Sequence, residues 1–233
     1  MIYFLGDVHE RFEHILPALL PRQKSDGEQA VIFLGDIECK APFEELIAPL
    51  TDAGIECWFI HGNHDTDKLQ DWLNLTSSNH RNLDGRVMTI QGKRIAGLGG
   101  IFRGAIWRPP TSSAYKNIEE FKQSRHFNPT PYPQGQLLKH CSSIWPDTFD
   151  ALAKEAADIL VTHDAPSCHE YGFEALDSLA QCLGVKQLFH GHHHQKVDYS
   201  KHTERMGFSA FCVPFQSIMS IEGEIVWAPK EYV

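Results

Sequence analysis

Residues 30–36 read Ala-Val-Ile-Phe-Leu-Gly-Asp, an apolar run that ends in a glycine and a carboxylate. The run is rich in β-branched and aromatic residues, which predicts a strand buried on both faces. Gly35 permits a sharp turn directly after the strand. Asp36 is therefore expected at the carboxyl end of a buried strand.

Four other apolar runs end in the same way. They are residues 2–5 before Gly6-Asp7-Val8-His9, 57–60 before His61-Gly62-Asn63-His64-Asp65, 159–162 before His163-Asp164, and 187–189 before His190-Gly191-His192-His193-His194. Helix-like stretches lie between these runs, and strands that alternate with helices predict an α/β domain. In such a domain ligands bind beyond the carboxyl ends of the strands. The five polar clusters are therefore expected to meet in one crevice.

The rest of the chain adds three features. Residues 86–98 read as a hairpin that turns at Gln91-Gly92. Three β segments near residues 208–227 indicate a second, more antiparallel sheet stacked against the first. The segment at about 101–146 fits no long element, because prolines interrupt it, and loops of this length are often functional. We interpret residues 1–233 as one domain with an irregular inserted loop at about 101–146.

Composition excludes several classes of protein. The 233 residues carry a net charge of −9, which argues against a surface for duplex nucleic acid. No apolar run is long enough to span a membrane and no secretory signal is present, so we expect a cytoplasmic protein. The six cysteines form no Cys-x-x-Cys pair, which favours free thiols. The sequence also lacks the dinucleotide fingerprint, the Walker lysine pattern and the nucleophile elbow.

The polar clusters have the composition of a metal site. They offer carboxylates, an amide and several of the 14 histidines, with no thiolate among them. Such a mixture of oxygen and nitrogen ligands suits manganese, iron or zinc. The sequence therefore predicts a metal centre at the carboxyl ends of the strands.

In their order along the chain, these clusters resemble the five motifs of the calcineurin-like metallophosphoesterases. The motifs are Asp7-x-His9, Gly35-Asp36, Gly62-Asn63-His64-Asp65, His163 and Gly191-His192-x-His194. The resemblance spans residues 6–194. It implies a four-layer α-β-β-α sandwich, in which two mixed β-sheets are flanked by helices and the metal site lies at the carboxyl ends of the strands.

The resemblance also implies a role for each motif residue. A first divalent metal ion would be held by Asp7, His9 and His194, a second by Asn63, His163 and His192, and Asp36 would bridge the two. His64 would protonate the leaving group, and Asp65 would accept a hydrogen bond from His64 and fix its tautomer. The implied cofactors are two divalent metal ions, with manganese expected and iron, zinc, nickel or cobalt as alternatives.

The implied activity is hydrolysis of a phosphate ester by a water molecule that the two metal ions activate. A phosphomonoesterase is favoured, with a phosphorylated small molecule or phosphopeptide as substrate. A phosphodiesterase that acts on cyclic or small nucleotides is the alternative. A second alternative is a non-catalytic binding scaffold of the same fold. The seven ligands and His64 are all intact, which argues against a scaffold.

The chain departs from the family's protein phosphatases just after Asp36. Cys39 and Lys40 stand where those enzymes have an Asp-Arg pair, whose arginine grips the phosphate. Lysine keeps the charge but loses the planar fork of donors, so a protein substrate is less favoured. The candidate substrate-binding residues are Asn63, His64 and Arg103 of the irregular loop, which also contains Arg108 and Arg125.

Overall fold

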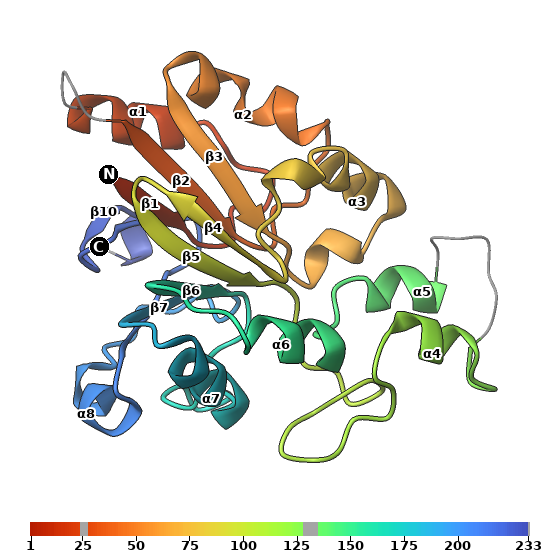
Figure 1. Cartoon of the computed structure of the whole chain (residues 1–233). Helices are drawn as coiled ribbons and strands as arrows, with labels where there is room; N and C mark the ends of the chain where they lie inside the picture. The colour runs from red at the N-terminus through yellow and green to blue at the C-terminus, as the bar shows by residue number, and fades with distance from the viewer. Residues whose placement is uncertain (24–27, 128–134, 233) are drawn as a thin grey trace.

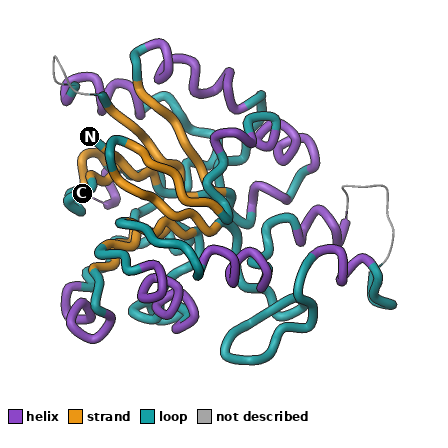
Figure 2. The backbone as a smooth tube through the Cα atoms, in the orientation of Figure 1, coloured by secondary structure: helices purple, strands orange, loops and turns teal. Residues whose placement is uncertain are grey.

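The computed structural model describes residues 1–23, 28–127 and 135–232. Two five-stranded sheets pack face to face, and helices cover the outer face of each (Figures 1 and 2). The first sheet contains β10 (Ile225–Trp227), β9 (Ile218–Ser220), β1 (Ile2–Leu5), β2 (Gln29–Leu34) and β3 (Ile55–Ile60), in that order. The second contains β4 (Arg86–Ile90), β5 (Lys93–Leu98), β6 (Ile159–Thr162), β7 (Gln187–His190) and β8 (Ser209–Cys212).

The helices divide between the two outer layers. The first sheet is covered by α1 (Ile15–Leu19), α2 (Phe43–Asp52) and α3 (Leu69–Thr76), and the second by α6 (Pro146–Leu152), α7 (Glu174–Leu183) and α8 (Thr203–Met206). The amphipathic α7 shows why these segments become helices, since Leu176, Leu179 and Leu183 recur at helical spacing and are buried. Gly184, in the left-handed conformation, ends the helix. The predicted four-layer α-β-β-α sandwich is confirmed.

The central strands are buried on both faces, as their apolar runs predicted. In β1, Tyr3 and Leu5 face the helices, while Ile2 and Phe4 face the second sheet. Phe4 stacks on Phe189 of β7 with a ring-centroid distance of 3.8 Å, and neither ring is exposed to solvent. Burial of each such ring stabilises the fold by about 1.5–3 kcal/mol. This contact helps to hold the two sheets, and hence their strand ends, in a fixed relation.

The predicted division of the strands between the sheets is wrong in one respect. The second sheet is not the more antiparallel one, because β5, β6, β7 and β8 pair in parallel and only β4 is antiparallel. The antiparallel pairs β1–β9 and β9–β10 lie in the first sheet, next to the parallel strands β1, β2 and β3. The three C-terminal segments therefore divide between the sheets.

The hairpin of β4 and β5 is confirmed. Its two turn residues, Gln91 and Gly92, both have positive φ, at 48° and 74°. This is the conformation that two-residue hairpin turns require, because it matches the twist of the strands. β5 then pairs with β6, so the hairpin forms the edge of the second sheet.

The segment at about 101–146 has more structure than the predicted irregular loop. It contains α4 (Ile118–Lys122) and α5 (Gly135–His140). Ile106, Phe121 and Trp145 form a small hydrophobic cluster that is separate from the main core. Residues 128–134 of this segment lie outside the described residues. Elsewhere, the six cysteines are free thiols, and no helix among the described residues is long and apolar enough to cross a membrane.

Candidate metal centre

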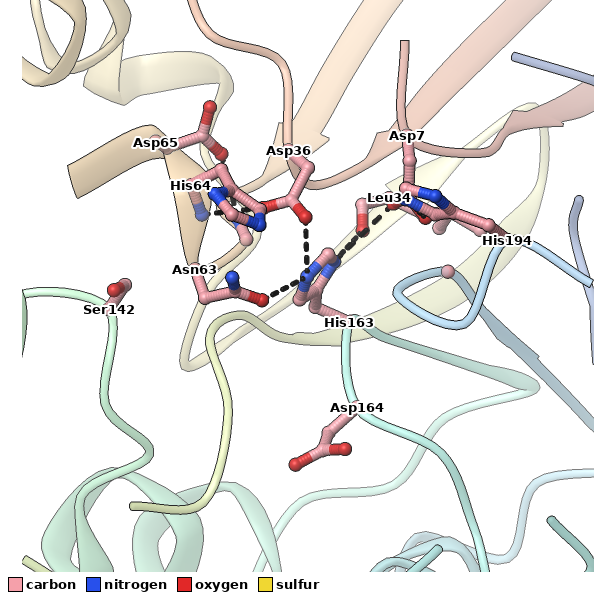
Figure 3. A network of polar contacts seen from close by, with 12 residues as sticks. Asp7, Leu34, Asp36, Asn63, His64, Asp65, Ser142, His163, Asp164 and His194 are labelled. Carbon is pink, nitrogen blue, oxygen red and sulfur yellow. Dashed lines mark hydrogen bonds and ion pairs between the residues drawn. The ribbon is translucent and has the colours of Figure 1, made fainter. Parts of the chain in front are cut away.

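Five strands deliver polar side chains to one end of the molecule. Asp7, Asp36 and Asn63 follow the adjacent parallel strands β1, β2 and β3 of the first sheet. His163 and His192 follow the adjacent parallel strands β6 and β7 of the second. Because the two sheets pack face to face, these strand ends meet, and Figure 3 shows His163 reached by Asp36 and Asn63 on one side and lying near Asp7 on the other. The predicted meeting of the polar clusters at the strand ends is confirmed.

The ligand atoms of these residues converge into two compact groups. His9, Asp36 and His194 form one, and Asp36, His163 and His192 form the other, with all ligand atoms in each group within 4.8 Å of one another. Asp36 belongs to both. This is the arrangement expected of two cations that share one carboxylate.

The backbone is strained where these side chains project. Of the nine described residues other than glycine with positive φ, five are candidate ligands: Asp7, His9, Asp36, His192 and His194, with φ of 22° to 71°. Such conformations cost on the order of 1–3 kcal/mol each and cluster at functional sites. These strained backbone conformations direct the five side chains toward the two groups of ligand atoms.

Two glycines make the close approach possible. Gly35 has a φ of 98°, and a Cβ atom there would lie 2.5 Å from Nδ1 of His163. A Cβ on Gly62 would lie 2.3 Å from the backbone nitrogen and Oδ1 of Asp36. Both distances are far shorter than any real contact, so a side chain at either position would displace a candidate ligand.

In the first group, Glu38 orients one of the candidate ligands. Nδ1–H of His9 donates a hydrogen bond to the carboxylate of Glu38, which leaves Nε2 free to face Nε2 of His194 at 3.3 Å. Oδ2 of Asp7 lies 3.3 Å from the same nitrogen of His194. Both carboxylate oxygens of Asp7 are buried, and burial raises the pKa of this carboxyl group.

In the second group, His163 is held by the backbone. Its Nδ1–H donates to the carbonyl oxygen of Leu34 at 2.7 Å, and its Nε2 lies 3.2 Å from Oδ1 of Asn63 and 3.4 Å from Oδ2 of Asp36. Burial alone would lower the pKa of His163, but the carboxylates of Asp36 and Asp7 outweigh it and raise the pKa to about 10. Burial and the neighbouring charge of His163 lower the pKa of His192 to about 3.

These features fit a pair of divalent cations. An ionised carboxylate as deeply buried as that of Asp7 is unfavourable unless a positive charge is close to it. The Nε2 atoms of His9 and His163 point into the two groups because their Nδ1 atoms are already hydrogen-bonded, which is the usual arrangement of metal-binding histidines. The donor set has oxygen and nitrogen and no thiolate, and suits manganese, iron or zinc.

A third group of potential ligands is formed by Asp164, His192 and His193. Both oxygens of Asp164 already accept backbone hydrogen bonds, from Phe102 at 3.0 Å and from Ala165 at 3.1 Å. His193 stacks on the ring of His169 with centroids 3.7 Å apart. These contacts give Asp164 and His193 structural roles beside the second group.

The predicted hydrogen bond from His64 to Asp65 is wrong. Nδ1–H of His64 donates instead to Oδ2 of Asp67, at 2.7 Å. Asp65 points the other way, and its oxygens accept the backbone N–H groups of Ile37, Glu38 and Gly62 at 2.7–2.8 Å. The reason is the helical turn His64–Thr66, in which side chains three residues apart share a face and adjacent ones do not. Asp65 therefore ties the loop after β2 to the loop after β3.

Lys40 does not replace the missing arginine as a free cation. Its ammonium group lies 2.5 Å from Asp71, 3.0 Å from Glu10 and 3.7 Å from Glu38. These carboxylates raise the pKa of Lys40 despite the opposing effect of burial. Cys39 is fully buried in the hydrophobic cluster on the helix side of the first sheet. Neither side chain is available to bind a phosphate group.

Arg103 is the loop arginine that lies beside the candidate site. Its Nη2–H donates to Oγ of Ser142 at 3.1 Å, and Ser142 is hydrogen-bonded at 2.7 Å to Thr66 of the His64 turn. Burial lowers the pKa of Arg103, and the negative charges of Asp67 and Asp36 oppose this effect in part. Arg108 instead lies over the ring of Phe173, 5.4 Å from its centroid.

Sequence reasoning missed Glu38 and Asp67. Asp67 could have been found, because a carboxylate three residues after a histidine on a helical turn shares its face. Glu38 gave no such signal, since its contact with His9 depends on the positive φ of both residues.

We expect Glu38→Gln to weaken the binding of one of the two metal ions about ten-fold, since such supporting carboxylates typically contribute ten- to 100-fold. Titration of the metal-free protein with manganese, followed by calorimetry, measures this. Glu44→Gln is the control, because Glu44 lies on α2 and forms an ion pair with Arg81 rather than contacting a candidate ligand. Equal metal affinities in both variants and the wild type would show that Glu38 does not support a ligand.

Known proteins are similar to this chain in sequence or in structure. The sequence matches the family model of the calcineurin-like phosphoesterases over residues 1–196. An uncharacterised protein of Haemophilus influenzae is 37% identical over 228 residues, which cover 96% of this chain and 95% of the relative. The crystal structure of TT1561 of Thermus thermophilus superposes with a TM-score of 0.53 at 15% identity, over 96% of each chain. A protein serine/threonine phosphatase of Saccharomyces cerevisiae gives a TM-score of 0.41 at 13% identity, over 93% of this chain and 71% of that chain.

Proposed function

The chain belongs to the calcineurin-like phosphoesterases, a family of metal-dependent hydrolases of phosphate esters, and from this premise we propose that it is a phosphomonoesterase. One observation carries the proposal: two groups of metal-ligand atoms share the single carboxylate of Asp36. In our assignment Asp7, His9 and His194 hold one divalent cation, Asn63, His163 and His192 hold the other, and Asp36 bridges them. Manganese is the proposed metal. When bound, the two cations neutralise phosphoryl oxygens and lower the pKa of a nucleophilic water.

His64 is proposed to protonate the leaving oxygen. Its backbone N–H donates to Oδ1 of Asp36 at 2.7 Å, which fixes the turn relative to the bridging carboxylate. Asp67 accepts the hydrogen bond from Nδ1, so Nε2 is the nitrogen that faces the substrate. Asp67 also favours the protonated imidazole, the form that a general acid needs.

Arg103 is proposed to bind the phosphate together with Asn63 and His64. The contact between Arg103 and Ser142 connects the guanidinium group to the turn that carries His64. A guanidinium group can form paired hydrogen bonds with two phosphate oxygens. A monoester has three terminal oxygens and two negative charges, so it satisfies both the cations and Arg103 better than a diester does.

We expect manganese-loaded protein to hydrolyse p-nitrophenyl phosphate with a higher kcat/KM than bis(p-nitrophenyl) phosphate. Removal of the metal with a chelator should lower turnover at least about 100-fold, because the nucleophile and the charge neutralisation both depend on the cations. Release of p-nitrophenol measures both effects, and added manganese should restore activity.

Three results would revise the proposal. A higher kcat/KM for the diester would favour a phosphodiesterase on cyclic or small nucleotides. Activity that survives exhaustive chelation would contradict the metal mechanism. Bound metal without turnover of either ester would favour a binding scaffold.

A further inference from the structure

A hollow of about 770 Å³ lies between the loop that precedes α4 and the chain that leads into α7 (elements labelled in Figure 1). Small-molecule sites typically measure about 300–1,000 Å³, so the hollow is large enough for a metabolite. Aromatic rings of Trp107, Tyr171 and Phe173 line it, and the charged groups in its wall are Arg108, Glu170 and Glu174. None of these residues is a candidate metal ligand.

Both walls of this hollow are held in place by contacts within the chain. In the loop before α4, Nε1–H of Trp107 donates to the carbonyl of Thr111 at 3.2 Å, and the backbone N–H of Thr111 donates to Arg108 at 3.1 Å. In the opposite wall, a Cβ atom on Gly172 would lie 1.9 Å from the carbonyl oxygen of Pro166. The chain is therefore tightly packed beside Tyr171, and the hollow is formed before any ligand binds.

Tyr171 exposes an unusually large part of its aromatic side chain to solvent. It is 64% exposed, the highest value among the exposed large hydrophobic residues in the described part of the chain. An exposed aromatic ring in the wall of a hollow is a common sign of a binding site.

Neighbouring aromatic and imidazole rings lie between this hollow and the candidate metal centre. The ring of Tyr171 lies 6.2 Å from that of His193, His193 lies 4.7 Å from His192, and His192 lies 4.9 Å from His163. His192 and His163 belong to the second group of ligand atoms. One side chain, His193, therefore lies between Tyr171 in the wall of the hollow and the candidate ligand His192. A ligand whose phosphate lies at the metal centre can place its remaining part beside Tyr171.

The chemistry of the walls indicates which part that is. Aromatic faces stack with planar rings, and the carboxylates of Glu170 and Glu174 accept hydrogen bonds from N–H and O–H groups. Carboxylates close to a phosphate site would repel a second acidic group, but they suit the hydroxyls of a ribose and the N–H groups of a base. The ring of a phosphotyrosyl peptide offers no such donors.

We propose that this hollow binds the nucleoside part of a nucleotide substrate, with the base against Tyr171. This inference rests on the proposed function, because it takes the metal centre as the site of the phosphate. It narrows the substrate from phosphate esters in general to those of nucleosides. Arg108, which lies over Phe173, supplies further donors for the base.

The test compares AMP with ribose 5-phosphate, which has the same phosphate and sugar but no base. The measured quantity is kcat/KM on manganese-loaded protein, or Kd by calorimetry if neither compound is hydrolysed. We expect AMP to be preferred about ten-fold, within the range that one base–aromatic stacking contact provides. Tyr171→Ala should bring the ratio close to one, while Tyr171→Phe should retain it.

Leu73→Ala is the control, because Leu73 is a 45% exposed residue on α3. It should leave the ratio as in the wild type. A ratio of one in the wild type, an unchanged ratio in Tyr171→Ala, or a preference for a phosphotyrosyl peptide over AMP would overturn the inference. If no phosphate ester is hydrolysed but the ratio of Kd values still depends on Tyr171, the proposed function fails and the nucleoside site stands.

Discussion

Asp36→Asn protein is expected to lose both metal ions together and to turn over no faster than the metal-free wild type. Asp36 is the one residue common to the two groups of ligand atoms, and it is buried. An amide has no negative charge and can offer only one oxygen, so it cannot serve two cations as a carboxylate does. The expected fall in kcat is at least about 1,000-fold, since both functions of the metal pair are lost.

The experiment measures metal content and turnover on the same samples. Each variant is dialysed against manganese and then against metal-free buffer, and bound metal is counted by mass spectrometry. His9→Ala and His192→Ala are the matched controls, because each removes a ligand from one group only. They should each retain one ion where Asp36→Asn retains none.

Loss of metal must be separated from loss of the fold. Asn at position 36 keeps an oxygen that can accept the backbone N–H of His64, as Oδ1 does at 2.7 Å. The thermal unfolding of metal-free Asp36→Asn should therefore resemble that of metal-free wild type. A folded Asp36→Asn protein that keeps one tightly bound ion would refute the bridging role.

The sequence predicted the convergence of the ligands well, for a physical reason. A strand buried on both faces is a run of apolar residues, and where the run stops the chain must emerge at the edge of the sheet. Residues such as Asp36 and His163 directly follow such runs, so their positions could be inferred without knowing how the strands pair.

Which strands share a sheet was less predictable. Strands β8 and β9 are both short and combine a serine with apolar residues, although β8 pairs in parallel with β7 and β9 pairs antiparallel with β1. Both environments select the same residue types, so composition does not separate them. The order of the strands depends on long-range pairing that no local pattern records.

Most of the supporting contacts were harder to predict from the sequence. The family resemblance implied Asp65 as the partner of His64, but a helical turn directs consecutive side chains to different faces, and Asp67 takes that place. Similarly, Lys40 kept the charge of the arginine it replaces, yet Glu10 and Asp71, distant in sequence from each other, both bind it. Such contacts follow from tertiary packing.

His64→Ala protein is expected to keep both metal ions and to lose most of its turnover. His64 belongs to neither group of ligand atoms, and its ring bonds to Asp67. General-acid catalysis typically contributes about 100- to 10,000-fold. The loss should depend on the leaving group, because p-nitrophenoxide leaves without a proton and a sugar alkoxide does not.

The decisive comparison is therefore between two substrates in one variant. For ribose 5-phosphate we expect kcat to fall by a factor in that range, and for p-nitrophenyl phosphate by at least about ten-fold less, because only the poor leaving group needs the acid. Asp67→Asn should show the same pattern with smaller losses, since the imidazole remains but its charged partner does not. Equal losses on both substrates, with both metals bound, would show that His64 positions the phosphate rather than protonating the leaving oxygen. Loss of either metal would instead make His64 part of the metal site.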